Sequence, residues 1–266
     1  MIVVYDYATG ESLYALGGSG HIEGKFPMVP GTNHIVAGSE KAALVWDVVQ
    51  GKMLANLMGH DGLVTCCSVT PDGLRILTGS RDADIRMWDI KSKAEICTLK
   101  GHSKQVCRLW VPPEGRYAIS SSIDRTLRGW DLAKKVEVWK RDGDVGVIGP
   151  IEYIAGTTYA ITSNYSEPVL LVLNYRTGQK CSCLVGHEGE ITGICVSRDG
   201  RFVVSASRDC SVRLWDLQTG KAISCFVGDA AMTCCALSLD ERTILAGDAI
   251  GAVHFLRIYN KGGTLE

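Results

Sequence analysis

The sequence lacks a long apolar run and an excess of charge of either sign. No stretch reaches the roughly 18 apolar residues that a membrane-spanning helix needs. The first residues carry no basic leader, and their apolar stretch is too short for a signal peptide. Lys and Arg number 28 against 29 Asp and Glu, which excludes the global basic field on which nonspecific nucleic-acid binding depends. We therefore expect a cytoplasmic protein that binds neither membranes nor nucleic acid.

Metal-binding and disulfide patterns are also missing. The chain has 11 cysteines and six histidines but no C-x-x-C and no H-x-x-x-H, so a zinc site is not expected. Cys66-Cys67 and Cys234-Cys235 occupy the same two positions of a repeating inner strand, which is typical of small buried hydrophobic residues. An odd cysteine count without a secretion signal indicates reduced thiols. We expect no metal and no cofactor.

Helical periodicity is absent as well, and a repeat takes its place. No segment of about ten or more residues has a convincing helical period. A Gly-His pair is followed three times by Trp-Asp, and in each case the Trp lies 28 residues after the His. The three sets are Gly59-His60 with Trp88-Asp89, Gly101-His102 with Trp130-Asp131, and Gly186-His187 with Trp215-Asp216.

The repeat extends over most of the chain. An Asp lies six residues before each of these Trp residues, and a Ser or Thr lies ten residues before it. When Tyr5, Trp46, Leu173 and Leu256 are aligned with the three tryptophans, neighbouring repeats are 41 to 43 residues apart. A period of about 40 to 45 residues with Gly-His and Trp-Asp motifs is typical of β-propeller blades. These residues resemble the WD40 repeat family, and the resemblance covers residues 2–258.

The apolar runs support the same fold. Within one repeat the runs 63–69, 74–78, 85–90 and 95–99 are separated by turn residues, as expected for a small antiparallel sheet of four strands. Such a sheet cannot cover its own apolar faces, so neighbouring sheets must pack on it. The turn after the first run recurs as Pro71-Asp72-Gly73, Pro113-Glu114-Gly115, Arg198-Asp199-Gly200 and Leu239-Asp240-Glu241.

We therefore predict an all-β WD40 β-propeller with six recognisable four-stranded repeats plus a partial one. The expected strands are one more than a six-bladed ring needs and three fewer than a seven-bladed ring needs. We expect a chain truncated at both ends that belongs to a seven-bladed or larger array. The alternative is a six-bladed ring in which the first segment pairs with the last unit. The predicted single domain covers 1–266, with repeat units near 17–58, 59–100, 101–143, 144–185, 186–227 and 228–266.

The resemblance implies a structural role for the repeated polar residues. In that family the Asp accepts a hydrogen bond from the His, and the His is linked through the hydroxyl to the Trp ring nitrogen. A nucleophilic triad is the alternative, but a hydrolase has one triad beside one oxyanion hole, whereas this set occurs three times with a Trp. The expected structural tetrads are His60, Thr78, Asp82 and Trp88, then His102, Ser120, Asp124 and Trp130, then His187, Ser205, Asp209 and Trp215.

The remaining repeats depart from this pattern, and we expect them to rely on packing alone. His21 lies 25 rather than 28 residues before Trp46. The residues at the hydroxyl and Asp positions are Val36 and Glu40, Ser163 and Glu167, and Ala246 and Ile250.

Two tryptophans lie outside the Trp-Asp series. Trp110 falls on an expected inner strand, which predicts a place in the core. Trp139 falls on an outermost strand, before Lys140-Arg141-Asp142, and is a candidate for an exposed contact residue.

The function that these patterns favour is a noncatalytic protein–protein interaction scaffold. The sequence is similar to the C-terminal WD40 modules of NACHT and WD repeat domain proteins, which implies an upstream nucleotide-binding domain in the same polypeptide. In the WD40 family, side chains after the Gly-His turn and before the turn Asp surround the channel mouth and bind proteins or peptides. Carried over, these are Leu63, Thr65 and Arg81, then Gln105, Cys107 and Ile123, then Glu190, Thr192 and Arg208.

Two other functions remain open. A basic rim could bind phosphoinositide or nucleic acid, and Arg81 and Arg208 occupy equivalent turn positions, but Ile123 and Ser166 interrupt that rim. An enzyme would need carboxylates or histidines converging at one end of the ring, and the available histidines are assigned to structure, so we do not expect catalysis. We expect Arg81 and Arg208 to anchor a partner; the alternative is that they pair locally, with Asp84 or Glu190.

Overall fold

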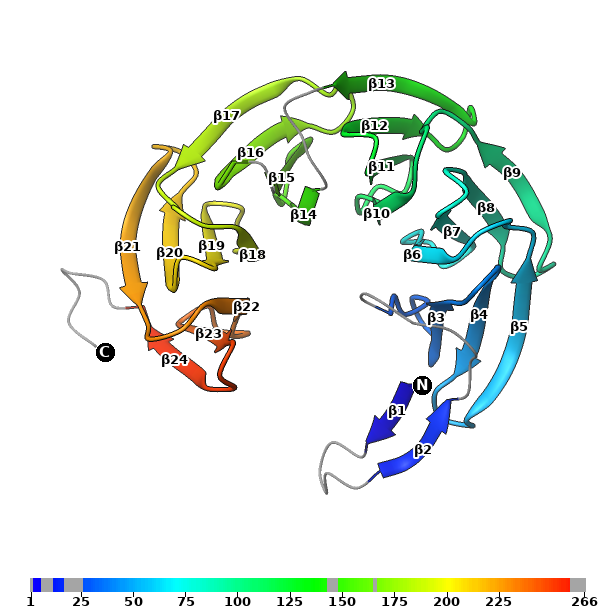
Figure 1. Cartoon of the computed structure of the whole chain (residues 1–266), viewed down its shortest axis with the longest axis horizontal. Coiled ribbons are helices and arrows are strands. Elements are labelled where there is room, and N and C mark those ends of the chain that lie inside the picture. The colour runs from blue at the N-terminus through cyan, green and yellow to red at the C-terminus, as the bar shows by residue number, and fades with distance from the viewer. Residues whose placement is uncertain (1, 6–11, 17–25, 143–147, 165–166, 259–266) are drawn as a thin grey trace. The chain divides into compact units, whose positions relative to one another are not determined.

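The computed structural model describes residues 2–5, 12–16, 26–142, 148–164 and 167–258. These residues contain strands and turns but no helix, as the sequence predicts. The strands form seven antiparallel sheets, and in each sheet they follow one another in chain order (Figure 1). The part of the chain that the structure describes contains no apolar helix of membrane-spanning length. The chain divides into two compact units, Met1–Val147 and Ile148–Glu266.

The first unit contains a hairpin, a three-stranded sheet and two four-stranded sheets. The hairpin is β1 (Ile2–Tyr5) and β2 (Ser12–Leu16), and the three-stranded sheet is β3 (His34–Gly38), β4 (Ala42–Asp47) and β5 (Lys52–Met58). The four-stranded sheets are β6 (Val64–Val69), β7 (Arg75–Ser80), β8 (Ile85–Asp89) and β9 (Glu95–Leu99), then β10 (Val106–Trp110), β11 (Tyr117–Ser122), β12 (Thr126–Asp131) and β13 (Val136–Asp142).

The second unit contains two four-stranded sheets and one three-stranded sheet. The first is β14 (Ile148–Tyr153), β15 (Tyr159–Asn164), β16 (Val169–Asn174) and β17 (Lys180–Val185). The second is β18 (Ile191–Val196), β19 (Phe202–Ser207), β20 (Ser211–Asp216) and β21 (Lys221–Val227), and the third is β22 (Met232–Leu237), β23 (Thr243–Asp248) and β24 (Val253–Arg257).

The cores lie between sheets rather than within them. Leu77 and Met87 of one sheet pack with Val106 and Trp130 of the next, and all four are almost fully buried. Both faces of the middle strands are covered. These strands therefore carry small or apolar residues at most positions, as is typical of strands that are buried on both faces. Each sheet therefore depends on its neighbour for most of its hydrophobic stabilisation.

The predicted recurrent turn is confirmed. Gly73, Gly115 and Gly200 adopt φ values of 69° to 70°, and Glu241 adopts 57° at the same place. In each case the backbone N–H donates to the carbonyl three residues earlier, at 2.8 to 2.9 Å. Glycine suits three of these turns because positive φ costs it nothing, and Glu241 accepts a strained conformation at the fourth.

The prediction of an exposed Trp139 is wrong, because this side chain is 9% exposed. It lies on β13 opposite Gly129 of β12, and a β-carbon on Gly129 would overlap the Trp139 ring. The missing side chain of Gly129 makes room for the ring, and the residue equivalent to Gly129 in the preceding sheet is Met87. Trp110, expected in the core, is half-buried at the end of β10.

Candidate functional site

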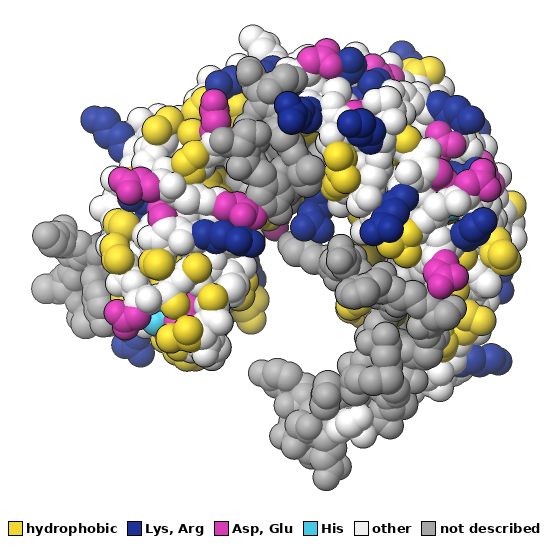
Figure 2. Space-filling view, viewed as in Figure 1, with side chains coloured by type: hydrophobic (Ala, Val, Ile, Leu, Met, Phe, Trp, Pro, Cys, Tyr) yellow, Lys and Arg dark blue, Asp and Glu magenta, His cyan; other side chains and the backbone are white. Residues whose placement is uncertain are grey.

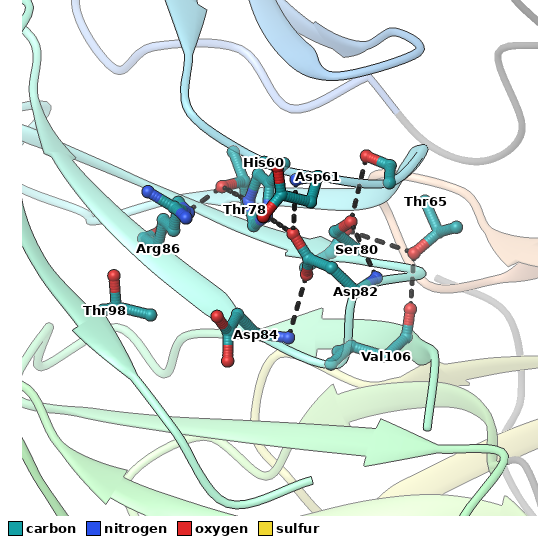
Figure 3. A network of polar contacts seen from close by, with 12 residues as sticks. His60, Asp61, Thr65, Thr78, Ser80, Asp82, Asp84, Arg86, Thr98 and Val106 are labelled. Carbon is teal, nitrogen blue, oxygen red and sulfur yellow. Dashed lines mark hydrogen bonds and ion pairs between the residues drawn. The ribbon is translucent and has the colours of Figure 1, made fainter. Parts of the chain in front are cut away.

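The first polar tetrad joins two turns and two strands of the sheet β6–β9. His60 precedes β6, Thr78 lies on β7 and Asp82 lies in the β7–β8 turn (Figure 3). Trp88 lies on β8. His60 Nδ1 is 2.8 Å from Asp82 Oδ2, and His60 Nε2 is 2.7 Å from Thr78 Oγ1. The Trp88 indole N–H donates to Thr78 Oγ1 at 2.9 Å. An ionised carboxylate only accepts, so Nδ1 carries the proton and the Thr78 hydroxyl donates to Nε2.

The same geometry recurs in the two other sheets for which the sequence predicts it. The His to Asp distance is 3.0 Å for His102 and 2.7 Å for His187. The His to hydroxyl distance is 2.7 Å in both sheets, and the Trp to hydroxyl distance is 2.8 Å in both. The structure therefore brings together all four members of each set.

Each tetrad also holds two turns together. Asp82 Oδ2 accepts the Asp61 backbone N–H at 2.9 Å, and Asp82 Oδ1 accepts the Asp84 N–H at 2.9 Å. The Trp88 ring packs in a core cluster shared with the preceding sheet, beside Val45. One polar group thus connects both turns at one end of a sheet to the packing between sheets.

The protonation states fit a structural network rather than a nucleophile. Burial is the main cause that lowers the pKa of His102 and His187, against the opposing effect of their Asp partners. Burial raises the pKa of Asp124, but hydrogen bonds from the Ser103 N–H, Thr126 and His102 outweigh it and lower that pKa to about 2. A neutral ring between a carboxylate and a fully buried hydroxyl leaves that oxygen no path to a substrate.

A further hydroxyl belongs to each network and was missed from the sequence. Ser80 Oγ donates to the Gly62 carbonyl at 3.0 Å and accepts the Asp82 N–H at 3.1 Å. Ser122 and Ser207 make the same two contacts. All three lie eight residues before the Trp, so the fixed spacing that revealed the tetrads could also have revealed them.

The last sheet has a different polar contact between a His and an Asp in place of the tetrad, although we expected packing alone. Asp248 lies eight residues before Leu256, at the serine position. His254 Nε2 on β24 is 2.9 Å from Asp248 Oδ2, and the His254 ring packs against Phe226 with centroids 5.3 Å apart. Because this His comes from the third strand, the Gly-His pattern could not reveal it. His21, the candidate of the β3–β5 sheet, lies outside the described residues.

The candidate partner-binding residues form one trio in each tetrad sheet. The backbone N–H of the turn residue donates to the carbonyl of the residue after the Gly-His turn, with Arg81 to Leu63 at 2.9 Å, Ile123 to Gln105 at 3.0 Å and Arg208 to Glu190 at 2.8 Å. Arg81, Ile123 and Arg208 are exposed, whereas Leu63, Thr65, Gln105, Cys107, Glu190 and Thr192 are half-buried.

Two members of these trios link neighbouring sheets. The Thr65 hydroxyl lies within hydrogen-bond distance of the Gly79 carbonyl at 3.1 Å and of the Val106 carbonyl on the next sheet. Thr192 is equally placed, 2.8 Å from the Met232 carbonyl. A partner would have to compete with these contacts, so the exposed turn residues are the better candidates.

The two arginines of the trios differ in their surroundings. Arg208 Nε is 3.0 Å from Glu190 Oε2, so local pairing holds for this residue. Arg81 makes no ion pair with any described residue, and its expected alternative partner Asp84 instead lies 3.8 Å from Lys100 Nζ. Of the two arginines, Arg81 therefore has the guanidinium that is open to a partner.

The cysteines do not gather into a metal site in the described part of the chain. Cys66, Cys67 and Cys235 are half-buried, and burial raises the pKa of the Cys66 thiol to about 12. Cys234 is exposed, contrary to the expectation for a repeating core position. Cys66 lies against Val106 of the next sheet. Cys234 lies on β22, and no described sheet of the second unit follows the sheet β22–β24 to cover it.

Comparison with known proteins relates this geometry to a family. Residues 51–89 and 93–131 match the family model of the WD domain, G-beta repeat. Residues 187–258 match the family model of the TEP-1 C-terminal beta-propeller. These three segments contain all members of all three tetrads.

The chain is also similar to curated proteins, among them two that are named WD repeat-containing proteins. The chain is 43% identical over 60 residues to WD repeat-containing protein 36 of Homo sapiens, a match that covers 23% of the chain and 7% of that protein. It is 28% identical over 192 residues to WD repeat-containing protein 37 of Xenopus tropicalis, covering 72% and 37%. It is 29% identical over 112 residues to Autophagy-related protein 18 of Komagataella pastoris, covering 41% and 21%. The chain therefore spans less than two fifths of the length of these relatives.

Proposed function

Because this chain belongs to the WD40 repeat family, we propose that it is a noncatalytic protein–protein interaction module of a larger regulatory protein. The observation that carries the proposal is that the tetrads serve as structural supports for the turns. Their histidines, carboxylates and hydroxyls bond to one another, and the side chains left exposed stand on turns that the tetrads hold. Recognition residues on rigidly supported turns lose little conformational entropy on binding.

The proposed surface lies on the adjacent sheets β6–β9 and β10–β13. Arg81 and Ile123 occupy equivalent turns there, and Thr65 and Val106 link the two sheets. An exposed guanidinium and an exposed isoleucine on equivalent turns of adjacent sheets suit a peptide in which a carboxylate lies near an apolar residue. Arginine in such a place can bond a carboxylate through two N–H groups. We propose Arg81 as the main anchor and Arg208 as a weaker one, because Glu190 already neutralises Arg208.

The test begins with partners captured by the full-length protein from its own cells and identified by mass spectrometry. The purified partner is then titrated against Arg81→Ala and Arg208→Ala chains whose melting is unchanged. We expect Arg81→Ala to cost more than about 1 kcal/mol of binding free energy and Arg208→Ala to cost less. Arg198→Ala, an exposed arginine in the β18–β19 turn, is the matched control. Unaltered affinity in both variants would move the interface away from these turns.

Binding of phosphoinositide or nucleic acid by a basic rim is less well supported. Ile123 takes the arginine position in one sheet, and Glu190 neutralises Arg208 in another. On the face shown in Figure 2, basic and acidic side chains are interspersed. Binding to phosphoinositide vesicles, or nucleic-acid binding that weakens steeply with salt, would favour this alternative.

The setting of the module is part of the proposal. We place it in the cytoplasm, joined to a nucleotide-binding domain in the same polypeptide, with the module acting as a sensor or an inhibitory lid. The support is the similarity to modules of that architecture and the balance of charge. Sequencing the full-length transcript and imaging a tagged full-length protein would test both points.

A further inference from the structure

Three arginines occupy one position of the third strand, two residues before the tetrad Trp. They are Arg86 on β8, Arg128 on β12 and Arg213 on β20. Arg86 Nη1 is 2.5 Å from Glu95 Oε2 on the neighbouring outer strand. Arg128 Nη1 pairs in the same way with the Glu137 carboxylate. Figure 3 shows Arg86 on its strand beside the tetrad members His60 and Thr78.

The third arginine has lost this partner. The glutamate stands seven residues after the Trp in two sheets, and that position of β21 is Ala222. Among the described residues Arg213 makes no ion pair and no side-chain hydrogen bond. Its Nε is buried without an acceptor, as is that of Arg86, but Arg86 pairs with a carboxylate through Nη1 and Arg213 does not. A partly buried guanidinium without a carboxylate has given up hydration with no charge to replace it. Arg213 is therefore an unmatched positive site.

The place of the missing carboxylate is open to solvent. Glu95 and Glu137 keep 30% and 31% of their side chains exposed even when paired, so this position can be reached from outside. On β21 the residues at and near it, Ala222 and Ser224, are small and exposed. In β13 the counterpart of Ser224 is Trp139, which covers the strand beneath it.

We propose that Arg213 binds a glutamate side chain of a protein partner, which takes the position that Glu95 and Glu137 occupy in the other sheets. Ile223 and Val227 on the same outer strand are 54% and 68% exposed and offer apolar contact beside the charge. A paired guanidinium and carboxylate form charge-assisted hydrogen bonds stronger than neutral ones. This contact lies between the third strand β20 and the outer strand β21 of one sheet, and it does not depend on the turn residues Arg81 and Arg208.

The chain contains its own controls for a test. The full chain is labelled with ¹⁵N-arginine, and the Nε–Hε signal of Arg213 is assigned with Arg213→Lys. The probe is N-acetylglutamate N-methylamide, and its neutral match is N-acetylglutamine N-methylamide. Ala222→Glu supplies the missing carboxylate within the chain, and Ala222→Gln adds the same volume without the charge.

We expect the glutamate probe to shift the Arg213 signal saturably and to leave Arg86 and Arg128 unmoved, because those two are already paired. Ala222→Glu should move the Arg213 signal without probe and weaken probe binding at least about tenfold, since a tethered carboxylate acts at high effective concentration. Ala222→Gln should bind the probe as the parent does. Glu95→Gln should make the Arg86 signal respond to the probe.

Three results would overturn the proposal. One is an Arg213 signal that responds equally to the glutamate and glutamine probes or to neither. Another is probe binding that survives Ala222→Glu. The third is tighter binding of inorganic phosphate than of the glutamate probe, which would assign the site to a phosphate group. None of these results bears on the turn surface, whose failure would show in the Arg81→Ala titration.

Discussion

At the scale of single residues, the tetrads place the most demanding requirement on side-chain chemistry. The carboxylate of Asp82 accepts from a His ring and from two backbone N–H groups, so three donors depend on one residue. Replacing it with alanine leaves those donors without their acceptor in a partly buried place. The desolvation that was offset by the hydrogen bonds then opposes folding.

We therefore expect Asp82→Ala, Asp124→Ala and Asp209→Ala each to lower the free energy of unfolding by about 1–3 kcal/mol. Urea denaturation monitored by tryptophan fluorescence measures the change. Asp229→Ala, in an exposed turn before β22, is the control and should change stability little. If all three tetrad variants unfold like the parent, the networks do not have the structural role assigned to them.

The same residues predict how stability depends on pH. The pKa of His102 and His187 is lowered in the folded chain, first by burial, so the unfolded chain binds protons more readily. Their contribution is present above the unfolded pKa of about 6.5 and is lost as the pH falls, by at most about 1.4 kcal/mol per histidine for each pH unit.

Urea unfolding between pH 7.5 and 5.5 tests this prediction. The free energy of unfolding should fall towards the acid end, before the carboxylates begin to titrate. A His102→Asn, His187→Asn double variant should be less stable at neutral pH but should show a flatter dependence. An identical slope in the parent and the double variant would contradict the prediction.

At the scale of strands, Trp139 and Gly129 show how a large side chain on one strand compensates for a missing side chain on the strand opposite. The adjacent sheet places Met87 opposite Cys97, and this sheet places Gly129 opposite Trp139. We expect Trp139→Ala to lower the free energy of unfolding by about 3–5 kcal/mol, because Gly129 has no side chain to fill the cavity that the lost ring leaves. The double variant Gly129→Met, Trp139→Cys copies the adjacent sheet and should recover at least about 1 kcal/mol of that loss. Thermal and urea unfolding of the parent, Trp139→Ala and the double variant measure the effect. A double variant that is less stable than Trp139→Ala would show that the two positions do not compensate for each other in volume.

This pair also shows where reasoning from the sequence stops. The strands, the recurrent turn and the members of the tetrads follow from residue spacing, because each repeat places the same chemistry at the same offset. The burial of Trp139 depends instead on which residue of β12 lies opposite it, a matter of register and bulges. The His254–Asp248 pair likewise joins two strands in a repeat that lacks the Gly-His motif. Such contacts leave no periodic signal.

The Arg213 position lies between these cases. Its spacing from Trp215 repeats that of Arg86 and Arg128 and is readable from the sequence. The absence of a partner becomes meaningful only when the structure shows that the equivalent arginines pair with the outer strand. A repeat protein thus offers internal comparisons, in which one sheet indicates what another lacks.

At the scale of the whole molecule, the face of β24 decides how the chain behaves alone. Val253 and Phe255 are 59% and 69% exposed. They lie three residues and one residue before the Trp-equivalent Leu256, as Ile85 and Met87 do before Trp88. Ile85 and Met87 are almost fully buried because the next sheet packs on them. The exposed pair therefore belongs to a face that is built for packing between sheets.

We expect the isolated chain of residues 1–266 to self-associate or to be poorly soluble, because β24 pairs only with β23 among the described residues and shows apolar side chains. Strand edges and apolar faces of this kind promote association. Sedimentation velocity should show oligomers. The double variant Val253→Lys, Phe255→Lys should reduce them, whereas the control Val185→Lys, on the outer strand β17, should not. If the chain is part of a longer protein, as we propose, adding the neighbouring sequence should have the same effect as the lysines. A monodisperse monomer that melts cooperatively would instead favour the closed six-bladed ring, in which the first segment completes the last sheet.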